Sequence, residues 1–316
     1  MTEPDRQDRT PIRERLIGLA LMLPVTLSRM LPYRWRVPVA GWLTARILAP
    51  LAGYSRRVRE NLALVFPDMP KAEVERIVRG VNDNAGRNMI ELYSPEFVSR
   101  GRNASATGPG LELLLKAQAQ GRPAVIVSGH LGSFNAARLR IVASGLRIAC
   151  FYRQMRNRPF NARYERAMTE ISEPVFVQNR AGVMQTVRHL RGGGTLAIMN
   201  DLNAHDGLPL DFFGHKALTS ISAAELALKY DAPLVPVWAR RMENGLDFEV
   251  HFEDEIPHTD PLTMTREFNR RLEARVRADM DQWFWIHRRW KDGTNPLGRQ
   301  RAADLEKLER RYARGG

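Results

Sequence analysis

The sequence predicts an α/β protein in which a central, mainly parallel or mixed sheet is flanked by helices. Short apolar runs rich in β-branched residues recur along the chain, separated by longer stretches with helical periodicity. Such alternation is typical of parallel sheets covered on both faces, and 316 residues with 44% hydrophobic content can bury the core that this requires. We expect strands at residues 124–127, 147–152, 174–178, 195–200 and 233–238, with helices between them.

The N-terminal segment differs from the rest of the chain in composition. Residues 15–59 contain eight arginines and not one Asp or Glu. Two apolar runs, 16–28 and 37–45, lie among the arginines, and both are shorter than the roughly 20 residues of a membrane-spanning helix. With the tryptophans nearby, this pattern predicts that residues 1–59 form a basic, apolar helical segment lying on a membrane surface. The alternative is a helical hairpin that covers the core and carries its arginines on a solvated face.

Residues 60–296 form the predicted α/β domain, and its first long helix is expected over residues 71–93. Apolar residues recur there at spacings of three and four. Arg87 and Glu91 are four residues apart on this helix, a spacing that forms a surface or half-buried ion pair.

The stretch 121–139, GRPAVIVSGHLGSFNAARL, places His130 at the end of a strand and just before a helix. In open α/β sheets, strand ends and helix N-termini converge at this position and form binding sites. Small residues such as Gly132 leave room there for a substrate. Asn135, five positions after the histidine, is expected to reach back across one helical turn. We therefore predict His130 as a general base with Asn135 as its orienting partner, the alternative being a core histidine in a tight turn.

Two further candidates follow the strand expected at 195–200. Asp201 comes directly after it, so this carboxylate either lies near His130 or caps its own loop. The apolar stretch 208–213 is either a wall for an apolar substrate, which would include Phe213, or part of the core.

The C-terminal part of the chain is expected to complete the sheet and its cover. Residues 247–252 alternate in polarity and predict a further strand at the edge of the sheet. Asp260 followed by Pro261 predicts a helix start, because the side chain caps the helix and the ring lacks an N–H that would stay unpaired. Residues 297–316 are dense in charge and predict an exposed helix or tail.

Composition restricts the possible partners and cofactors. With 48 basic and 35 acidic residues, the net charge of +13 favours nucleic acid, an anionic membrane or an acidic substrate. Aromatic and cationic residues alternate over residues 283–290, but no nucleic-acid-binding motif accompanies them, so nucleic acid is not expected as a partner. Cys150 is the only cysteine, which excludes an internal disulfide and argues against a zinc site built on thiolates.

Several motifs resemble those of a known family. They are RRVRENLALVFPDM (56–69), AGRNMIELY (85–93), FYRQMRN (151–157), DLNAHDGLPLDFFG (201–214) and DQWFWIHRRWK (281–291). In this order, and with AVIVSGH (124–130) between the second and the third of them, they resemble the bacterial lipid A biosynthesis acyltransferases of lauroyl and myristoyl type, within the lysophospholipid acyltransferase-like superfamily. The family motif is His, four residues, then Asp or Glu. Here Asn135 stands at the acidic position.

The resemblance implies a membrane-associated O-acyltransferase. Such an enzyme moves a fatty acyl group from a thioester of acyl carrier protein or coenzyme A to a hydroxyl of a lipid acceptor, and needs no metal or redox cofactor. Arg153 and Arg166 would lie near the substrate, where guanidinium groups bind anionic groups through paired hydrogen bonds. Arg87 and Glu91 would brace the site. The implied location is the cytoplasmic face of the bacterial inner membrane, with the protein peripheral or anchored by its N-terminal segment.

The exchange to Asn135 leaves alternatives open, because an amide accepts an imidazole N–H but supplies no negative charge to the imidazolium. The acceptor is either a lipid A precursor or a lyso-aminolipid or lysophospholipid. A different hypothesis is a catalytically inactive relative that binds lipid. Consumption of acyl thioester in the presence of lipid extract separates an enzyme from such a relative.

Overall fold

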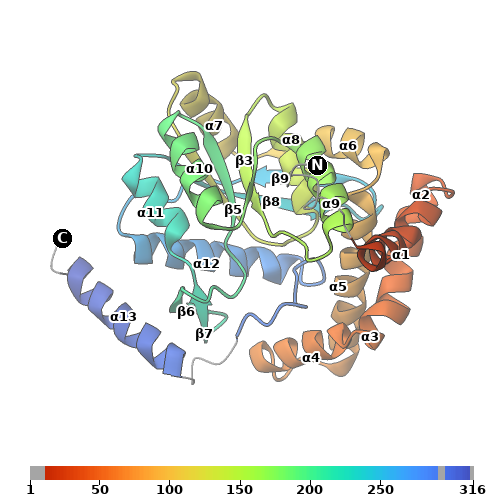
Figure 1. The fold of residues 1–316 in the computed structure, drawn as a ribbon. Coiled ribbons are helices and arrows are strands. Elements are labelled where there is room, and N and C mark those ends of the chain that lie inside the picture. Colours follow the sequence, from red (N-terminus) through yellow and green to blue (C-terminus); the bar gives the residue numbers. More distant parts are fainter. Residues whose placement is uncertain (1–10, 291–295, 314–316) are drawn as a thin grey trace.

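The computed structural model describes residues 11–290 and 296–313, and a seven-stranded sheet lies at its centre (Figure 1). The strand order is β1-β9-β8-β2-β5-β3-β4, and all neighbours are parallel except β8 and β9. The predicted α/β fold with a mainly parallel sheet is therefore confirmed. The strands are β1 (Ser105–Thr107), β2 (Ala124–Ser128), β3 (Ile148–Tyr152), β4 (Val175–Val177), β5 (Thr195–Met199), β8 (Leu234–Arg241) and β9 (Phe248–Phe252).

Helices surround the sheet, and a two-stranded hairpin of β6 (Leu208–Phe212) and β7 (His215–Thr219) lies beside it (Figure 1). The helices are α1 (Ile12–Ser28), α2 (Tyr33–Leu43), α3 (Ala49–Leu51), α4 (Tyr54–Val65), α5 (Lys71–Glu91), α6 (Pro95–Arg102), α7 (Gly110–Ala119), α8 (Phe134–Ala143), α9 (Arg158–Ile171), α10 (Arg180–Arg191), α11 (Ser222–Lys229), α12 (Pro261–Ala278) and α13 (Pro296–Ala313), with a π-helical segment at Thr44–Leu48.

The central strand β2 has both faces buried. Successive side chains of a strand point to opposite faces. Val125 and Val127 pack in the same core cluster as residues of α11 and α12, whereas Ala124 and Ile126 pack with residues of α7 and α8. The residues that follow β2 therefore emerge between two helical layers, at the carboxyl edge of the sheet.

The N-terminal helices α1–α4 lie along one side of the molecule (Figure 1). The predicted boundary between residues 59 and 60 falls inside α4, so the N-terminal segment and the following domain share a helix. Within the described residues, no helix is long and apolar enough to cross a membrane.

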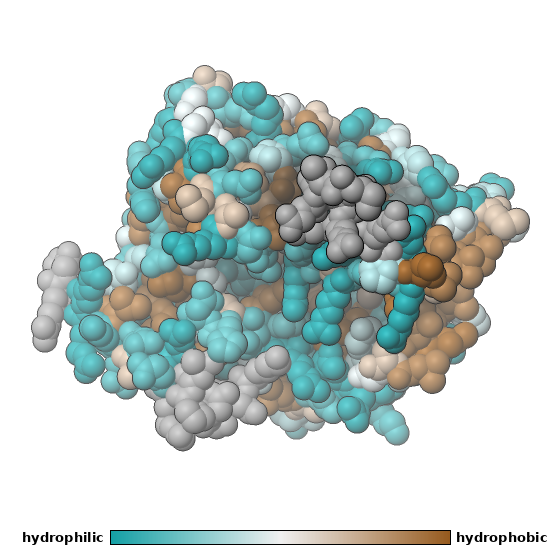
Figure 2. Space-filling view, viewed as in Figure 1, coloured by the Kyte–Doolittle hydropathy of each residue, from teal (hydrophilic) through white to brown (hydrophobic). Residues whose placement is uncertain are grey.

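Large apolar side chains remain exposed on these N-terminal helices. Figure 2 shows hydrophobic surface gathered on the side of the molecule where they lie. Leu51 is 83% exposed, and the two tryptophans Trp35 and Trp42 are 58% and 55% exposed. The other large apolar residues exposed between positions 12 and 54 are Ile12, Leu16, Ile17, Leu19, Leu21, Leu23, Leu27, Met30, Leu31, Val39, Leu43, Ile47, Leu48 and Tyr54. A contiguous apolar surface of this kind marks an interaction site.

Two expectations about the C-terminal half need correction, and one element there was not predicted. The strand predicted at the edge, β9, lies inside the sheet because β1 pairs with its outer side. The hairpin β6–β7 was not predicted. Helix α13 is not exposed on all sides, because Leu305 is buried against Leu208, Leu210 and Leu262.

Candidate active site

His130 and Asp201 lie side by side at the carboxyl ends of two neighbouring parallel strands. The register of β2 and β5 pairs Ser128 with Met199. His130 and Asp201 each follow two residues after this pair. The backbone N–H of Asn200 still donates to the carbonyl of Ser128 at 2.9 Å, so the pairing extends beyond the strands. As a result, Nδ1 of His130 lies 2.8 Å from Oδ1 of Asp201.

The Asp201 carboxylate is buried and accepts hydrogen bonds from three N–H groups. Besides the imidazole, the backbone N–H of His130 donates to Oδ2 at 2.7 Å and the indole Nε1 of Trp283 donates to Oδ2 at 3.0 Å. Burial alone would raise the pKa of Asp201, but the charge of His130 and these donors outweigh it and hold the pKa below its usual value. Because an ionised carboxylate only accepts, Nδ1 carries the proton whenever the His130 ring is neutral, and Nε2 is then left to accept one.

Gly132 turns the chain between His130 and α8. Its φ is +56°, and a Cβ at this position would lie 2.1 Å from the carbonyl oxygen of Ala239, so only glycine fits. The carbonyl of Gly132 accepts from the side-chain amides of Asn84 at 3.0 Å and Asn88 at 2.7 Å. Helix α5 thereby holds the turn after the histidine.

The two asparagines are held in turn by a buried ion pair. Arg241 donates to both carboxylate oxygens of Glu91, at 2.5 and 2.8 Å, and to the side-chain oxygens of Asn84 and Asn88. Both members of the ion pair are buried. The brace expected from Glu91 thus exists, but it pairs with Arg241, whereas Arg87 pairs with Asp83.

A cavity of about 270 Å³ opens beside His130, between the sheet, α8 and α9. Its wall includes the apolar side chains of Ile126, Ala137, Ile141, Met168, Ala197 and Val237. The cavity suits an apolar chain, because apolar side chains line it on several sides.

A larger and more polar cleft of about 1030 Å³ adjoins this cavity. It lies at the carboxyl ends of β3 and β5, beside α10 and α11, and its lining includes Asn179, Asn203 and Ser220. Arg153 lines both the cleft and the cavity. Among the described residues, no group of three His, Cys, Asp or Glu side chains is placed to hold a metal ion.

Comparisons with known proteins identify the family. The sequence profile of the bacterial lipid A biosynthesis acyltransferases matches residues 9–292. The chain belongs to this family. Among solved structures, one match is the 1-acyl-sn-glycerophosphate acyltransferase PlsC from Thermotoga maritima, with 14% identity, a TM-score of 0.36, and coverage of 85% of this chain and 99% of that one. No curated protein matches the chain.

In this acyltransferase, Asn135 does not orient the histidine as expected. Its Oδ1 accepts from the guanidinium of Arg138 at 3.1 Å, while Nδ1 of His130 is held by Asp201. The reason is the turn at Gly132, which separates His130 from α8, so the spacing of a continuous helix does not apply. Of the two readings of Asp201, the structure supports a carboxylate partner for the histidine.

Two predicted substrate-binding residues lie away from the histidine. Arg166 lines a separate cavity beside α1. Phe213 is buried among Phe66, Phe212 and Trp285, and it is not among the described residues that line the cavity or cleft at His130. Phe213 is therefore a core residue.

Sequence reasoning missed two groups beside the site. Trp283 was noted only as part of an aromatic motif, although its indole donates to Asp201. Arg138 was not singled out, yet it lines the cavity while nearly completely buried, and its guanidinium donates to neutral acceptors of Asn135, Met168 and Ser172. Burial lowers the pKa of Arg138. No sequence signal marked it, because a single arginine in a helix reads as solvated surface.

Proposed function

We propose that this acyltransferase moves a fatty acyl group from a thioester of acyl carrier protein or coenzyme A to a free hydroxyl of a lipid acceptor, with His130 as general base. A lipid A precursor is the proposed acceptor, as the family's description suggests. The observation that carries the proposal is the contact of His130 with the buried Asp201 beside an apolar cavity.

The proton transfers follow from the tautomer of the histidine. Nε2 of His130 takes the proton of the acceptor hydroxyl as its oxygen attacks the thioester carbonyl. Asp201 stabilises the imidazolium that forms and keeps the ring oriented. When the carbon–sulfur bond breaks, the leaving thiolate takes the proton back from Nε2, so the base is regenerated.

The N-terminus of α8 would stabilise the negatively charged oxygen of the tetrahedral intermediate. The helix begins at Phe134, four residues after His130, and its N-cap Ser133 makes no side-chain hydrogen bond to the first turn. The first N–H groups of a helix have no acceptor within the helix and carry partial positive charge. They are suitable donors for an oxyanion formed beside His130.

The cavity and the cleft supply room for the two substrates. The acyl chain would occupy the apolar cavity bounded by α8 and α9. Arg153, which lines both spaces, is placed to bind an anionic group of the donor or acceptor.

The exposed apolar surface of α1–α3 would attach the protein to a membrane, with the cytoplasmic face of the bacterial inner membrane as the proposed location. Its exposed leucines and tryptophans lie among arginines, a combination typical of helices in the interface between water and lipid. Peripheral attachment brings the site to a lipid acceptor without a spanning helix.

The test is a transfer assay in detergent with labelled acyl thioester and a lipid A precursor. His130→Ala should lower the rate by about 10²–10⁴-fold, the usual contribution of a general base. His215→Ala is the matched control, because His215 is not among the described residues that line the cavity or the cleft, and it should leave the rate near that of the wild type. Robust transfer by folded His130→Ala would refute the proposed base, and acylation of lysophospholipid alone would refute the proposed acceptor.

A further inference from the structure

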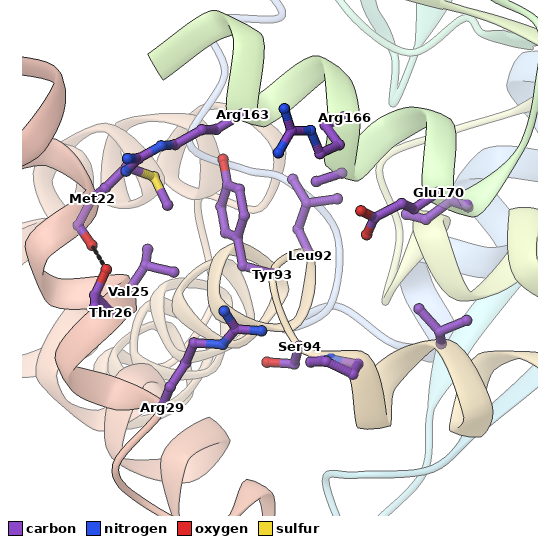
Figure 3. A pocket seen from close by; sticks show the side chains of 14 residues that line it. Met22, Val25, Thr26, Arg29, Leu92, Tyr93, Ser94, Arg163, Arg166 and Glu170 are labelled. Atoms are coloured by element: carbon purple, nitrogen blue, oxygen red, sulfur yellow. Dashed lines mark hydrogen bonds between the residues drawn. The ribbon is translucent and has the colours of Figure 1, made fainter. Parts of the chain in front are cut away.

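A second cavity, of about 660 Å³, lies between α1, α9 and the connection from α5 to α6 (Figure 3). Helix α9 separates it from the catalytic cavity. Tyr164 and Met168, four residues apart on α9, line the catalytic cavity, whereas Arg163 and Arg166 line the second one. The two cavities therefore share a helix but not their lining residues.

Three arginines give the second cavity an excess of positive charge. Arg29 comes from the end of α1, and Arg163 and Arg166 come from α9 (Figure 3). Within the described part of the chain, none of these guanidinium groups forms an ion pair or hydrogen bond, and Glu170 is the only carboxylate in the lining. Three unpaired cations against one carboxylate leave a net positive charge, which favours binding of an anion.

A neutral donor accompanies the arginines. Figure 3 shows the Tyr93 side chain between Arg163 and Arg166, with its hydroxyl directed into the cavity. Burial raises the pKa of Tyr93 to about 12, so the hydroxyl keeps its proton and donates to an anionic ligand. Guanidinium and hydroxyl donors together match the several oxygens of a phosphate group.

The inner wall of the cavity is apolar. Met22 and Val25 of α1 are buried there, and Leu92, Val98 and Ile171 line it from the other side. Other side chains of α1, such as Leu19 and Leu23, belong to the exposed apolar surface. A ligand in this cavity thus meets cations, apolar walls and the predicted membrane surface, which is a combination that fits a lipid and not a free phosphate ion.

The contacts between α1 and α9 show that the cavity is built by packing. A Cβ at Gly18 would lie 3.0 Å from Cβ of Pro159, so glycine lets the two helices approach closely. Asn157 donates its side-chain amide to the carbonyl of Glu14 at 2.8 Å, and the Glu14 carboxylate accepts from the backbone N–H of Arg158 at 2.8 Å. These contacts fix α1 against the start of α9. Arg163 and Arg166 follow one to three helical turns later on α9.

We infer that the cavity between α1 and α9 binds the phosphate group of an anionic membrane lipid at a site separate from the catalytic cavity. The inference rests on the membrane attachment in the proposed function but not on the catalytic step. A lipid held there orients the protein on the bilayer, with α9 between the bound headgroup and the catalytic cavity.

The test measures binding of the full chain to phosphatidylcholine vesicles that contain phosphatidic acid. The triple variant Arg29→Gln, Arg163→Gln and Arg166→Gln should bind them roughly 100-fold more weakly, since one cation near an anionic surface contributes about fivefold. The charge-preserving pair Arg163→Lys and Arg166→Lys should lose less, because lysine keeps the charge but not the paired donors. Where the triple variant fails to fold, the double variant Arg163→Gln and Arg166→Gln replaces it, with roughly 25-fold loss expected.

A charge-matched control distinguishes a site from diffuse attraction. Arg180, Arg188 and Arg191 are exposed on α10, away from α1 (Figure 1), and their replacement by Gln removes the same charge. Equal loss of binding in this variant and in the cavity variant would overturn the inference. Vesicles in which oleate supplies the same negative charge should bind more weakly than phosphatidic acid vesicles, and equal binding would overturn the preference for phosphate.

Two further measurements use inorganic phosphate as a competitor and acyl transfer as a readout. Inorganic phosphate alone should neither raise the melting temperature nor displace the vesicles, and displacement that depends on the three arginines would assign the cavity to a free anion. Acyl transfer in detergent should persist in the cavity variant. Loss of vesicle binding with transfer retained supports the second site, whereas absence of transfer in the wild type would refute the proposed function and leave the binding result standing.

Discussion

Replacement of Asp201 by Asn tests the histidine–carboxylate pair with a change of only one non-hydrogen atom in the side chain. The carboxylate accepts three hydrogen bonds, one at Oδ1 and two at Oδ2. An amide offers one accepting oxygen and one donating NH₂ group. Asn at position 201 therefore cannot reproduce all three bonds in either of its orientations.

The preferred orientation of the amide inactivates the base. If the carbonyl takes the place of Oδ2, it keeps the bonds from the His130 backbone and Trp283, and the NH₂ group faces Nδ1. Nδ1 must then accept, so the proton moves to Nε2 and blocks it. The opposite orientation keeps the active tautomer but leaves two N–H donors unpaired, which costs about 1–3 kcal/mol each.

The difference between the two orientations sets the expected effect on rate. Reaching the active tautomer costs roughly 2–6 kcal/mol, or about 30- to 10⁴-fold in turnover. The upper end agrees with the loss of about 10⁴ known for the same exchange in a serine protease.

Three measurements check this prediction. Turnover of acyl thioester should fall as stated, ¹⁵N NMR of the imidazole should show the proton on Nε2, and circular dichroism should show an intact fold. Asp254→Asn is the control, since that side chain is exposed and is not among the described residues that line the cavity or the cleft at His130. A folded Asp201→Asn enzyme that keeps more than about a tenth of the wild-type rate would refute the reasoning.

The other predictions concern charges around the site. Asn135→Asp should change turnover by less than about threefold and raise the melting temperature, because the new carboxylate meets Arg138 and not His130; a large gain in rate would contradict this. Glu91→Gln should lower the free energy of unfolding by about 3 kcal/mol or more in urea titrations, since it leaves Arg241 buried without its partner, and a smaller loss would place the brace elsewhere. Hydrogen bonds from Arg270 and then Arg271 outweigh burial and lower the pKa of Glu267 to about 2, so its stabilisation is complete above its unfolded pKa of about 4.5 and is lost as the pH falls towards 2. Glu267→Gln should therefore destabilise the protein clearly at about pH 5.5 and much less at about pH 2.5, and a constant difference would exclude the linkage.

The sheet and the position of the histidine were predictable because both depend on local patterns. The apolar run of β2 and the helical period of α8 fix the site between them. The pairing of β2 with β5 is non-local, and it decides which carboxylate reaches His130. Spacing along one helix favoured Asn135, whereas the strand register favours Asp201, and only the structure gives that register.

The hairpin β6–β7 was missed because its turn lacks the usual signal. Phe213 and Gly214 form its two-residue loop with φ values of 53° and 74°. Two positive φ values are typical of a type I′ turn, which normally contains Asn-Gly or Asp-Gly. Here Phe213 is held by tertiary contacts, including a bond from its backbone N–H to Glu273 and the guanidinium of Arg277, 4.9 Å from its ring. Tertiary packing thus replaces local propensity, and an apolar run that read as a substrate wall is a turn in the core.

The carboxylate's position on another strand changes what stabilises the catalytic pair. A partner one helical turn away on α8 would depend on that helix alone. Asp201 instead reaches His130 through the β2–β5 register, and Trp283, from the C-terminal part of the chain, fixes the carboxylate from a third direction. The C-terminal segment also accepts from the turn, since the N–H of Gly132 donates to the carbonyl of Gln282 at 3.0 Å. The pair therefore forms only when strands and C-terminal segment are packed together, so the orientation of the base depends on the complete domain.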